Sequence, residues 1–352
     1  MNRPSVKKIV FVAIAVLSVI IIYFFLYPSK EKELRFPDIV TSPDMNSMVI
    51  SGKPFVIDLN EKKLANRDSV VITSGNTTTN LKGKFRYEVS TAEMPLGYNK
   101  TTITIHTGSK TKIIDLPFIV TSDVTPLPIN YIQRSSVSHD TRSYTQGLEV
   151  LNGILYESAG QYGESTIRKV NPTSGVVIKS VSLAKEYFGE GLTVLNGKVY
   201  QLTWKEGICF VYDKDLNLLK KTNFRSANGE GWGVCNNGKS LIISDGSNKL
   251  TYINPETFVV EKIISVYAGA NEVQNLNELE YVDGYIYANV YTTNQIAKIE
   301  ANTGKVVSVI DFTALKNENQ DGDVLNGIAF NPTSGTFFIT GKYWKKMYDV
   351  KM

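Results

Sequence analysis

A strand–turn–strand phrase that recurs five times after residue 140 constrains the fold of this chain more than any other feature. Each copy begins with an apolar strand, passes through a turn that contains glycine and continues into a second strand. The copies read TQGLEVLNGILYES, GEGLTVLNGKVYQLTW, WGVCNNGKSLIISDG, NELEYVDGYIYANVY and NGIAFNPTSGTFFITGKYW. Their turn glycines, spaced 41 to 51 residues apart, are Gly153, Gly197, Gly238, Gly284 and Gly335. A repeat of about 40–50 residues made of short strands is typical of a β-propeller with one four-stranded sheet per repeat.

A second pair of strands follows the phrase in each of the first four repeats, with Asn-Pro, Asp or Thr-Gly residues at the turns. These pairs span 167–181, 210–222, 250–264 and 296–310. The fifth repeat ends one strand short, whereas the segment around residue 130 resembles the last strand of a repeat. We therefore expect residues 129–137 to close the last sheet, because an unpaired sheet edge invites aggregation. The sequence predicts an all-β fold with a five-bladed β-propeller over residues 128–352.

The segment from residue 36 to residue 123 has a different composition, rich in Thr, Val and Ile with alternating polarity, as in SVVITS and TTITIHT. Roughly 90 residues of short strands separated by glycine turns favour a small immunoglobulin-like β-sandwich. No residue pattern in it indicates chemistry, so we interpret 36–123 as a spacer or docking module. Pro126 and Pro128 stiffen the link to the propeller.

An apolar run of 19 residues without a charge extends from Ile9 to Tyr27. At about 1.5 Å per residue, a helix of this length crosses a bilayer core of roughly 30 Å. Arg3, Lys7 and Lys8 precede the run, and bulky residues occupy the place where a signal peptidase would need small ones. The pattern predicts that residues 1–28 are a cytoplasmic stub and an uncleaved transmembrane signal anchor, rather than a cleaved signal peptide. A single-pass membrane protein with an extracytoplasmic catalytic domain follows, periplasmic in a Gram-negative cell.

Charge, cysteine and histidine content exclude several classes of function. The 38 basic and 34 acidic residues leave a net charge of only +4, which argues against a nucleic-acid partner. Cys209 and Cys235 lie in adjacent repeats, as two isolated core thiols or as one bridge. The two histidines, His106 and His139, are too few for a histidine-rich zinc site.

The repeats also predict which side chains meet at the axis of the propeller. About seven residues before each turn glycine, where the innermost strand begins, the sequence has Gln146, Glu190, Trp232, Asn277 and Asn326. About seven residues after the glycine, it has Trp204, Asp245, Tyr291 and Lys342. Polar groups that converge in an aromatic-lined concavity are the usual form of a ligand or active site.

Glu190 is the sharpest catalytic candidate, because burial near aromatic residues raises the pKa of a carboxyl group toward neutrality. The alternative is a structural carboxylate that accepts hydrogen bonds from strand N–H groups. Lys342 is either a partner for a developing oxyanion or an exposed strand-end lysine. The SDGS context of Asp245 favours a structural role in a turn. Glu278 and Glu280 alternate with Asn277 along the strand, so we expect their side chains to point away from the ligand. The three tryptophans, Trp204, Trp232 and Trp344, suit blade packing as well as a ligand platform.

These stretches together resemble the glutamine cyclotransferases of the plant and bacterial type, the family of the papaya glutaminyl cyclase. The matching motifs are SHD and YTQGL (138–148), YESAGQYGES (156–165), YFGEGLT (187–193), QLTWK (201–205), GEGWG (229–233), ISDGS (243–247), LNELEY (276–281), ANVYTTNQIAKIE (288–300) and DVLNGIAF with ITGKYWKKMY (323–348). They run in the same order as in the family over residues 128–352. The resemblance says nothing about residues 1–125.

The resemblance implies an enzyme that converts the N-terminal glutamine of peptides or proteins to pyroglutamate and releases ammonia. It places the family's catalytic glutamate on Glu190 and its lysine on Lys342. Its substrate-binding residues fall on Gln146, Phe188, Trp204, Trp232 and Asn277. Two positions depart from the family pattern, Tyr144 in place of Phe and Tyr291 in place of Trp, and both remain aromatic. No cofactor or catalytic metal is implied, although the channel leaves room for a structural Ca²⁺ ion.

The chemistry suits one carboxyl group, which can take a proton from the attacking amine and return it to the departing nitrogen. Two other readings compete with this one. A non-catalytic propeller would use the same ring to bind a peptide. A lactonase-type hydrolase would need a divalent metal, for which a single axial carboxylate among amides is a thin ligand set.

Overall fold

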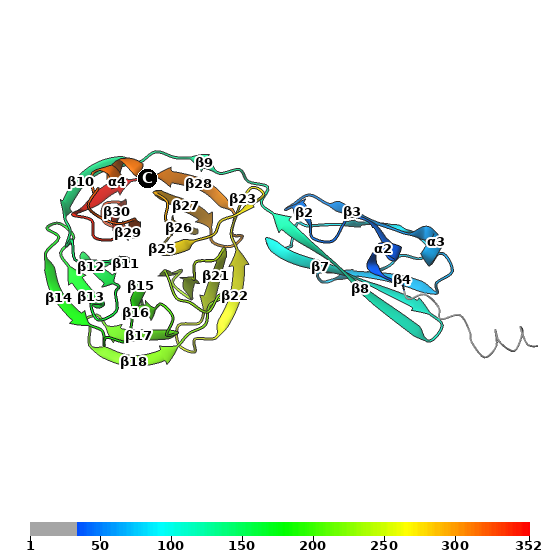
Figure 1. Ribbon diagram of the computed structural model, residues 1–352, viewed down its shortest axis with the longest axis horizontal. Helices are drawn as coiled ribbons and strands as arrows, with labels where there is room; N and C mark the ends of the chain where they lie inside the picture. Colours follow the sequence, from blue (N-terminus) through cyan, green and yellow to red (C-terminus); the bar gives the residue numbers. More distant parts are fainter. Residues whose placement is uncertain (1–33) are drawn as a thin grey trace, which may run out of the picture.

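The structure, a computed structural model, describes residues 34–352. From residue 127 onward its strands form five sheets around one axis, the ring at the left of Figure 1, and one separate two-stranded hairpin. The first sheet contains β11 (Thr145–Leu151), β12 (Ile154–Ala159), β13 (Thr166–Val170) and β14 (Val177–Ser182). The second contains β15 (Gly189–Leu195), β16 (Lys198–Thr203), β17 (Ile208–Asp213) and β18 (Leu218–Asn223). The third contains β19 (Val234–Asn236), β20 (Leu241–Ser244), β21 (Lys249–Ile253) and β22 (Val260–Ser265).

The last two sheets complete the ring. The fourth contains β25 (Leu276–Val282), β26 (Tyr285–Val290), β27 (Gln295–Glu300), β28 (Val306–Asp311) and the short β9 (Leu127–Pro128). The fifth contains β29 (Leu325–Asn331), β30 (Thr336–Gly341), β31 (Lys346–Lys351) and β10 (Ile132–Ser138), and the short helix α4 (Thr313–Asn317) precedes it. The innermost strands are β11, β15, β19, β25 and β29. Each contacts the next, and β29 contacts β11.

The fifth sheet is closed by a strand from the beginning of the ring. β10 pairs antiparallel with β31, so that Ser136 lies opposite Tyr348 and Val137 opposite Met347. This pairing confirms the prediction that a segment near residues 129–137 supplies the missing strand. The two ends of the ring are thus held together by a strand ladder, and β10 covers the edge that β31 would otherwise leave open.

The hairpin turns explain why the repeated glycines occur where they do. Asn152 and Gly153, between β11 and β12, have φ angles of 52° and 75°. Asn196 and Gly197 repeat these values closely at 52° and 75°. Two successive residues with positive φ form the type I′ turn that matches the twist of a two-residue hairpin, and Asn-Gly is its preferred sequence.

Aliphatic and aromatic side chains fill the spaces between neighbouring sheets. Clusters such as Leu250, Ile286 and Ile299, or Leu202, Val211 and Ile243, are almost fully buried between adjacent sheets. Cys209 and Cys235 are buried free thiols in these cores.

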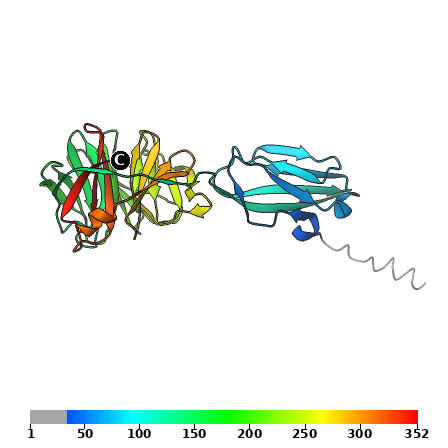
Figure 2. The ribbon, with the colours of Figure 1, turned by 90° about the horizontal axis from the view of Figure 1, so that it is seen from above.

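The segment before the ring forms two sheets that enclose a separate core. One contains β1 (Val40–Ser42), β3 (Phe55–Leu59) and β6 (Arg86–Val89). The other contains β2 (Ser47–Ile50), β4 (Ser69–Ser74), β5 (Thr77–Asn80), β7 (Gly97–Thr107) and β8 (Lys110–Thr121). The short helices α2 (Phe36–Ile39) and α3 (Glu61–Leu64) complete this part. Figure 2 shows it beside the ring, and Ile57, Ile72 and Leu116 lie in its core.

A hairpin inserted in the ring, β23 (Tyr267–Ala268) and β24 (Asn271–Glu272), contacts the N-terminal part. Tyr267 is buried in a cluster with Phe118 and Val120 of β8. The backbone of Ser122 donates to Gly269 in the same hairpin, at 3.0 Å. These contacts attach the N-terminal sheets directly to the ring.

The apolar run at residues 9–27, predicted to be a membrane anchor, lies outside the described residues. Within residues 34–352, no helix has both the length and the apolar character needed to cross a bilayer.

Candidate active site

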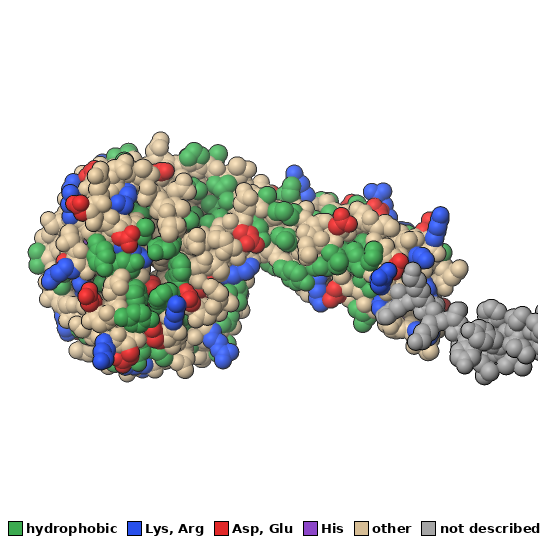
Figure 3. Space-filling model, viewed as in Figure 1, with side chains coloured by type: hydrophobic (Ala, Val, Ile, Leu, Met, Phe, Trp, Pro, Cys, Tyr) green, Lys and Arg blue, Asp and Glu red, His purple; other side chains and the backbone are tan. Residues whose placement is uncertain are grey.

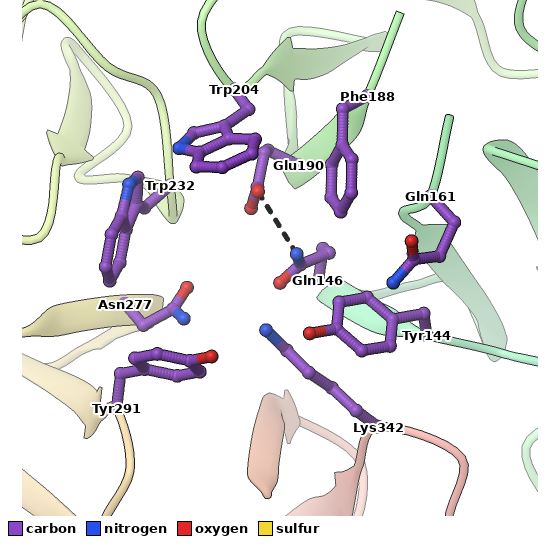
Figure 4. A pocket seen from close by; sticks show the side chains of 10 residues that line it. All are labelled: Tyr144, Gln146, Gln161, Phe188, Glu190, Trp204, Trp232, Asn277, Tyr291 and Lys342. Carbon is purple, nitrogen blue, oxygen red and sulfur yellow. Dashed lines mark hydrogen bonds between the residues drawn. The ribbon is translucent and has the colours of Figure 1, made fainter. Parts of the chain in front are cut away.

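A pocket at the axis of the ring brings together side chains from all five sheets or the loops that join them (Figure 4). It has a volume of about 200 Å³. Its lining comprises Tyr144, Gln146, Gln161, Phe188, Glu190, Trp204, Trp232, Asn277, Tyr291 and Lys342. Nine of these ten are site residues predicted from the sequence, seven from the repeat offsets and two, Tyr144 and Phe188, from the family resemblance. In the space-filling view, hydrophobic side chains gather around the centre of the ring (Figure 3).

β-Bulges at the start of the innermost strands aim the polar side chains into this pocket. The register with the neighbouring strand shifts between Thr145 and Gly147, which places Gln146 at the irregularity. It shifts again after Gly189, where Glu190 lies, and after Leu276, where Asn277 lies. A bulge leaves the extra residue unpaired and reorients its side chain, which is why bulges are common beside active sites.

Glycine at the next position lets the innermost strands approach closely. A Cβ atom on Gly147 would lie 2.4 Å from the backbone nitrogen of Leu192 in the next sheet. A Cβ atom on Gly191 would lie 2.6 Å from the backbone nitrogen of Val234. The TQGL and GEGL phrases therefore combine a pocket residue with the glycine that allows the strands to converge around it.

Glu190 is almost completely buried, with 5% of its surface exposed. Its Oε1 accepts a hydrogen bond of 3.1 Å from Nε2 of Gln146. Burial raises the pKa of Glu190 well above its ordinary value, and the charges of Glu230 and Glu206 act in the same direction. The positive charge of Lys342 opposes this rise. A carboxyl group with a raised pKa is the kind of group that general acid–base catalysis near neutral pH uses.

Lys342 is not an exposed strand-end lysine, since only 3% of its surface is accessible. Its Nζ lies 4.5 Å from the ring centre of Tyr144 and 4.8 Å from that of Tyr291, between the two rings in Figure 4. Burial lowers the pKa of Lys342, whereas the charges of Glu190 and Asp323 raise it. The two tyrosines hold the ammonium group in the pocket by cation–π interactions.

Gln146 is oriented by Asn326, which the repeat offsets predicted to lie at the mouth of the channel. Asn326 does not line the pocket; its Nδ2 donates to Oε1 of Gln146 and to the carbonyl of Thr145, both at 3.0 Å. Because the amide oxygen of Gln146 is occupied in this way, its Nε2 is the end that faces Glu190. On the opposite side, Oδ1 of Asn277 is buried and has no hydrogen-bond partner, so it is available to a ligand.

Aromatic rings form the walls of the pocket. Phe188 meets Trp204 edge to face with ring centres 5.6 Å apart, and Trp232 meets Tyr291 in the same way at 5.6 Å. Tyr144 completes the wall beside Phe188, at 6.2 Å. Burial raises the pKa of Tyr144, so its hydroxyl is a neutral hydrogen-bonding group near neutral pH. The third tryptophan, Trp344, is fully buried outside the pocket.

Two other carboxylates near the axis, those of Asp245 and Glu278, accept hydrogen bonds from backbone N–H groups. Asp245 accepts from the backbone nitrogen of Asn228 at 2.7 Å and from Ser247, in keeping with a turn role. Glu278 accepts from the backbone nitrogens of Leu148 and Ile328, on two other innermost strands. It points away from the pocket, as its alternation with Asn277 predicted. Within residues 34–352, no group of three His, Cys, Asp or Glu side chains has an arrangement suited to a metal ion.

Sequence reasoning missed Gln161 and Glu230. Gln161 has a positive φ of 104° in the loop after β12. Gly246, Thr292 and Tyr343 occupy the same position in three other repeats and also have positive φ, but they do not line the pocket. Glu230 lies behind the pocket wall, where its Oε2 accepts from the indole nitrogens of Trp204 and Trp232. The GEGWG phrase was the available signal, because it puts a carboxylate two residues before a predicted pocket tryptophan.

Comparison with known proteins identifies the family. The model of the glutamine cyclotransferase family matches residues 115–352. A glutaminyl-peptide cyclotransferase of Arabidopsis thaliana is 39% identical over 221 residues, which are 61% of this chain and 68% of the relative. The crystal structure of Myxococcus xanthus glutaminyl cyclase matches with a TM-score of 0.60 and 33% identity, covering 64% of this chain and 97% of that one. The chain belongs to the glutamine cyclotransferase family.

Proposed function

We propose that this chain is a glutaminyl-peptide cyclotransferase, which converts the N-terminal glutamine of a peptide or protein to pyroglutamate with release of ammonia. The family match and both relatives support this activity. The observation that carries the mechanism is a single carboxyl group, that of Glu190, buried at the centre of a pocket walled by aromatic rings.

Glu190 acts as the general acid and base in this proposal. Its carboxylate takes a proton from the substrate's α-amine as the amine nitrogen attacks the carbon of its own γ-carboxamide. The new bond closes the five-membered lactam, the bond to the departing nitrogen breaks, and Glu190 returns the proton so that ammonia leaves. Atoms and charge balance without any other reactant, so the reaction as written needs neither a cofactor nor a metal. A structural Ca²⁺ ion elsewhere in the channel would take no part in it.

The other pocket residues bind and fold the substrate. We assign Lys342 to the carboxamide oxygen, where negative charge develops in the tetrahedral intermediate. Gln146 and the unpartnered oxygen of Asn277 supply polar contacts to the substrate amine and amide. The aromatic walls hold the glutamine side chain curled back on its own amine, because an intramolecular reaction mainly needs a near-attack geometry.

The architecture around the site extends the same proposal. The ring of five sheets is a five-bladed β-propeller at residues 128–352, and the two N-terminal sheets at 36–123 are an immunoglobulin-like spacer. Residues 1–28 anchor the chain in a membrane with its N-terminus cytoplasmic and the pocket on the extracytoplasmic side, where peptide substrates with N-terminal glutamine would reach it.

Ammonia release from a dipeptide that begins with glutamine, catalysed by the full chain in detergent, tests the function. Glu190→Gln should lower kcat by about 10²–10⁴-fold, the typical contribution of a general acid–base group, while the protein stays folded. Glu261→Gln, an exposed carboxylate on the outer strand β22, is the matched control and should retain full turnover. A folded Glu190→Gln variant with unchanged turnover would refute the assignment. A folded wild-type chain without turnover would leave a peptide-binding propeller instead.

A further inference from the structure

One carboxylate oxygen outside the pocket lining holds both tryptophans of the pocket wall. Oε2 of Glu230 accepts a hydrogen bond of 2.7 Å from Nε1 of Trp204 and another of 2.9 Å from Nε1 of Trp232. Figure 4 shows the nitrogen edges of the two indoles turned toward the same region, on the far side of the pocket from Lys342. Trp204 follows β16 of the second sheet, whereas Trp232 precedes β19 of the third, so Glu230 joins two sheets through their indoles.

The backbone around Glu230 is tied to the same two sheets, and the contact with the third sheet is the 3.0 Å hydrogen bond that the backbone nitrogen of Trp232 donates to the carbonyl of Ser244. The backbone nitrogen of Gly231 donates to the carbonyl of Trp204 at 2.8 Å. The carbonyl of Trp232 accepts from the backbone nitrogen of Gly191, next to Glu190, at 2.7 Å. The hydroxyl of Ser226 donates to the carbonyl of Glu230 at 2.7 Å. The loop that carries Glu230 is therefore held in place on both sides, and the carboxylate has a defined position relative to the catalytic strand.

Other contacts fix the planes of the indoles but leave their N–H edges to Glu230. Phe188 packs against Trp204 from the side, and Lys205 lies over one face of its ring at 3.9 Å from the centre. Tyr291 packs edge to face against Trp232. Hydrogen bonds to an ionised acceptor are shorter and stronger than those between neutral groups, so the carboxylate is well suited to lock both rings.

We propose that Glu230 is a positioning residue for the cyclisation, which sets the orientation of Trp204 and Trp232 and places a second negative charge behind Glu190. This inference rests on the proposed function, because the oriented indoles are the wall against which the glutamine side chain of the substrate is folded. Misplacing such a wall by about 1 Å can cost on the order of 10²-fold in rate.

The charge of Glu230 also acts on the proton carrier itself. Burial is the main reason that the pKa of Glu190 is raised, and Glu230 and Glu206 raise it further while Lys342 lowers it. The hydroxyl of Tyr144 faces the same cavity. Removing the charge of Glu230 therefore lowers the pKa of Glu190. If ionised Glu190 is the base that begins the reaction, the acid limb of the profile of kcat against pH moves to lower pH.

The test combines tryptophan emission without substrate and kinetics with a glutamine-initiated dipeptide, on the full chain in detergent. Two of the three tryptophans are those bound by Glu230, and the third, Trp344, donates to the carbonyl of Asp323 away from the pocket. Glu230→Ala removes both indole hydrogen bonds. Glu230→Gln removes the charge but retains an acceptor oxygen. Glu206→Gln is the matched control, because Glu206 also raises the pKa of Glu190 yet is bonded to Tyr162 rather than to an indole.

We expect Glu230→Ala to shift the emission maximum, to increase quenching by acrylamide and to lower kcat/KM on the order of 10²-fold. Glu230→Gln should retain an emission spectrum close to that of wild type and move the acid limb to lower pH. Glu206→Gln should move the acid limb without altering the emission. Wild-type emission and kinetics in Glu230→Ala, or an unmoved acid limb in Glu230→Gln, would overturn the proposal. The emission measurement needs no turnover, so its failure is distinguishable from failure of the proposed function.

Discussion

The seam that closes the ring contains a buried ion pair whose removal should destabilise the protein strongly. Nε2 of His139 lies 2.9 Å from Oε1 of Glu157, and both side chains are almost inaccessible to solvent. The same oxygen accepts hydrogen bonds from the hydroxyls of Ser143, at 2.5 Å, and Thr145, at 3.0 Å. Nδ1 of His139 is 2.8 Å from the carbonyl oxygen of Trp344, so the pair connects the first sheet to the turn between β30 and β31.

The pKa values give the size of the effect. Burial alone would raise the pKa of Glu157, but His139, with Arg168, lowers it from 4.5 to about 2. That shift corresponds to roughly 3 kcal/mol of preference for the ionised carboxylate in the folded protein. Burial alone would lower the pKa of His139, yet Glu157 raises it above 6.5. We therefore expect His139→Gln to reduce the free energy of unfolding by about 3 kcal/mol near pH 6, within the range for breaking a buried pair.

The sign of the pH dependence follows from the two directions. Glu157 is depressed, so its contribution is present above pH 4.5 and is lost as the pH falls from 4.5 toward 2. His139 is raised, so its contribution is complete below pH 6.5 and is lost as the pH rises through its folded pKa. The pair contributes most between these limits, and His139→Gln should remove the loss of stability on the alkaline side.

Urea unfolding followed by tryptophan emission measures this effect, since all three tryptophans lie in the ring. A double-mutant cycle with Glu157→Gln isolates the coupling between the two side chains from their separate costs. A coupling energy below about 0.5 kcal/mol, or an unfolding free energy with the same alkaline slope in wild type and His139→Gln, would refute the reasoning, because independent sites add within that margin.

Two further predictions concern the pocket. Lys342→Met should lower kcat on the order of 10²-fold, the cost of losing one group that stabilises a developing oxyanion. It should also move the acid limb of the kcat profile to higher pH, because the charge of Lys342 lowers the pKa of Glu190. An unmoved acid limb would contradict this electrostatic effect of Lys342 on Glu190. Gly147→Ala should destabilise the ring by about 1–3 kcal/mol and reduce turnover, because its Cβ would lie 2.4 Å from the backbone of Leu192. Gly153→Ala, which strains a turn with φ of 75° but has open space around it, is the control that should lose stability while keeping kcat; equal kinetic effects in the two variants would count against a steric origin.

The repeats allowed much of the fold and the pocket lining to be predicted from sequence, because equivalent offsets in a ring converge on one axis. Gln146, Glu190 and Asn277 occur seven residues before their turn glycines, and all three line the pocket. The offset predicts that a side chain lies near the axis of the ring, but not whether it reaches the pocket. Asn326 shares the offset, after a local insertion, yet its amide is used by Gln146 and the carbonyl of Thr145. Whether such a side chain enters the pocket therefore depends on the hydrogen-bond partners that the folded ring places beside it.

Residues outside the repeated phrase were beyond this kind of prediction. Gln161 enters the pocket from the loop after β12, whereas Gly246, Thr292 and Tyr343, at the same offset and also with positive φ, do not line it. Glu230 acts through two indoles on different sheets, a relation that appears only once the sheets are placed side by side. The preceding proposals about the membrane anchor depend on sequence alone, because residues 9–27 lie outside the described part of the chain.

The pocket depends on the same seam that closes the ring. Tyr144 and Gln146 belong to the start of the first sheet, whereas Lys342 follows β30 in the fifth, and the backbone nitrogen of Tyr343 donates to the carbonyl of Ser143 at 2.8 Å. Across this seam Asn326 turns Gln146 toward Glu190, and Lys342 lies against the ring of Tyr144. Opening the seam would therefore separate Lys342 from the ring of Tyr144 and release the amide of Gln146 that is bound to Glu190. Because the β10–β31 ladder and the contact between β11 and β29 lie at the same seam, we expect closure of the ring and assembly of the pocket to occur together.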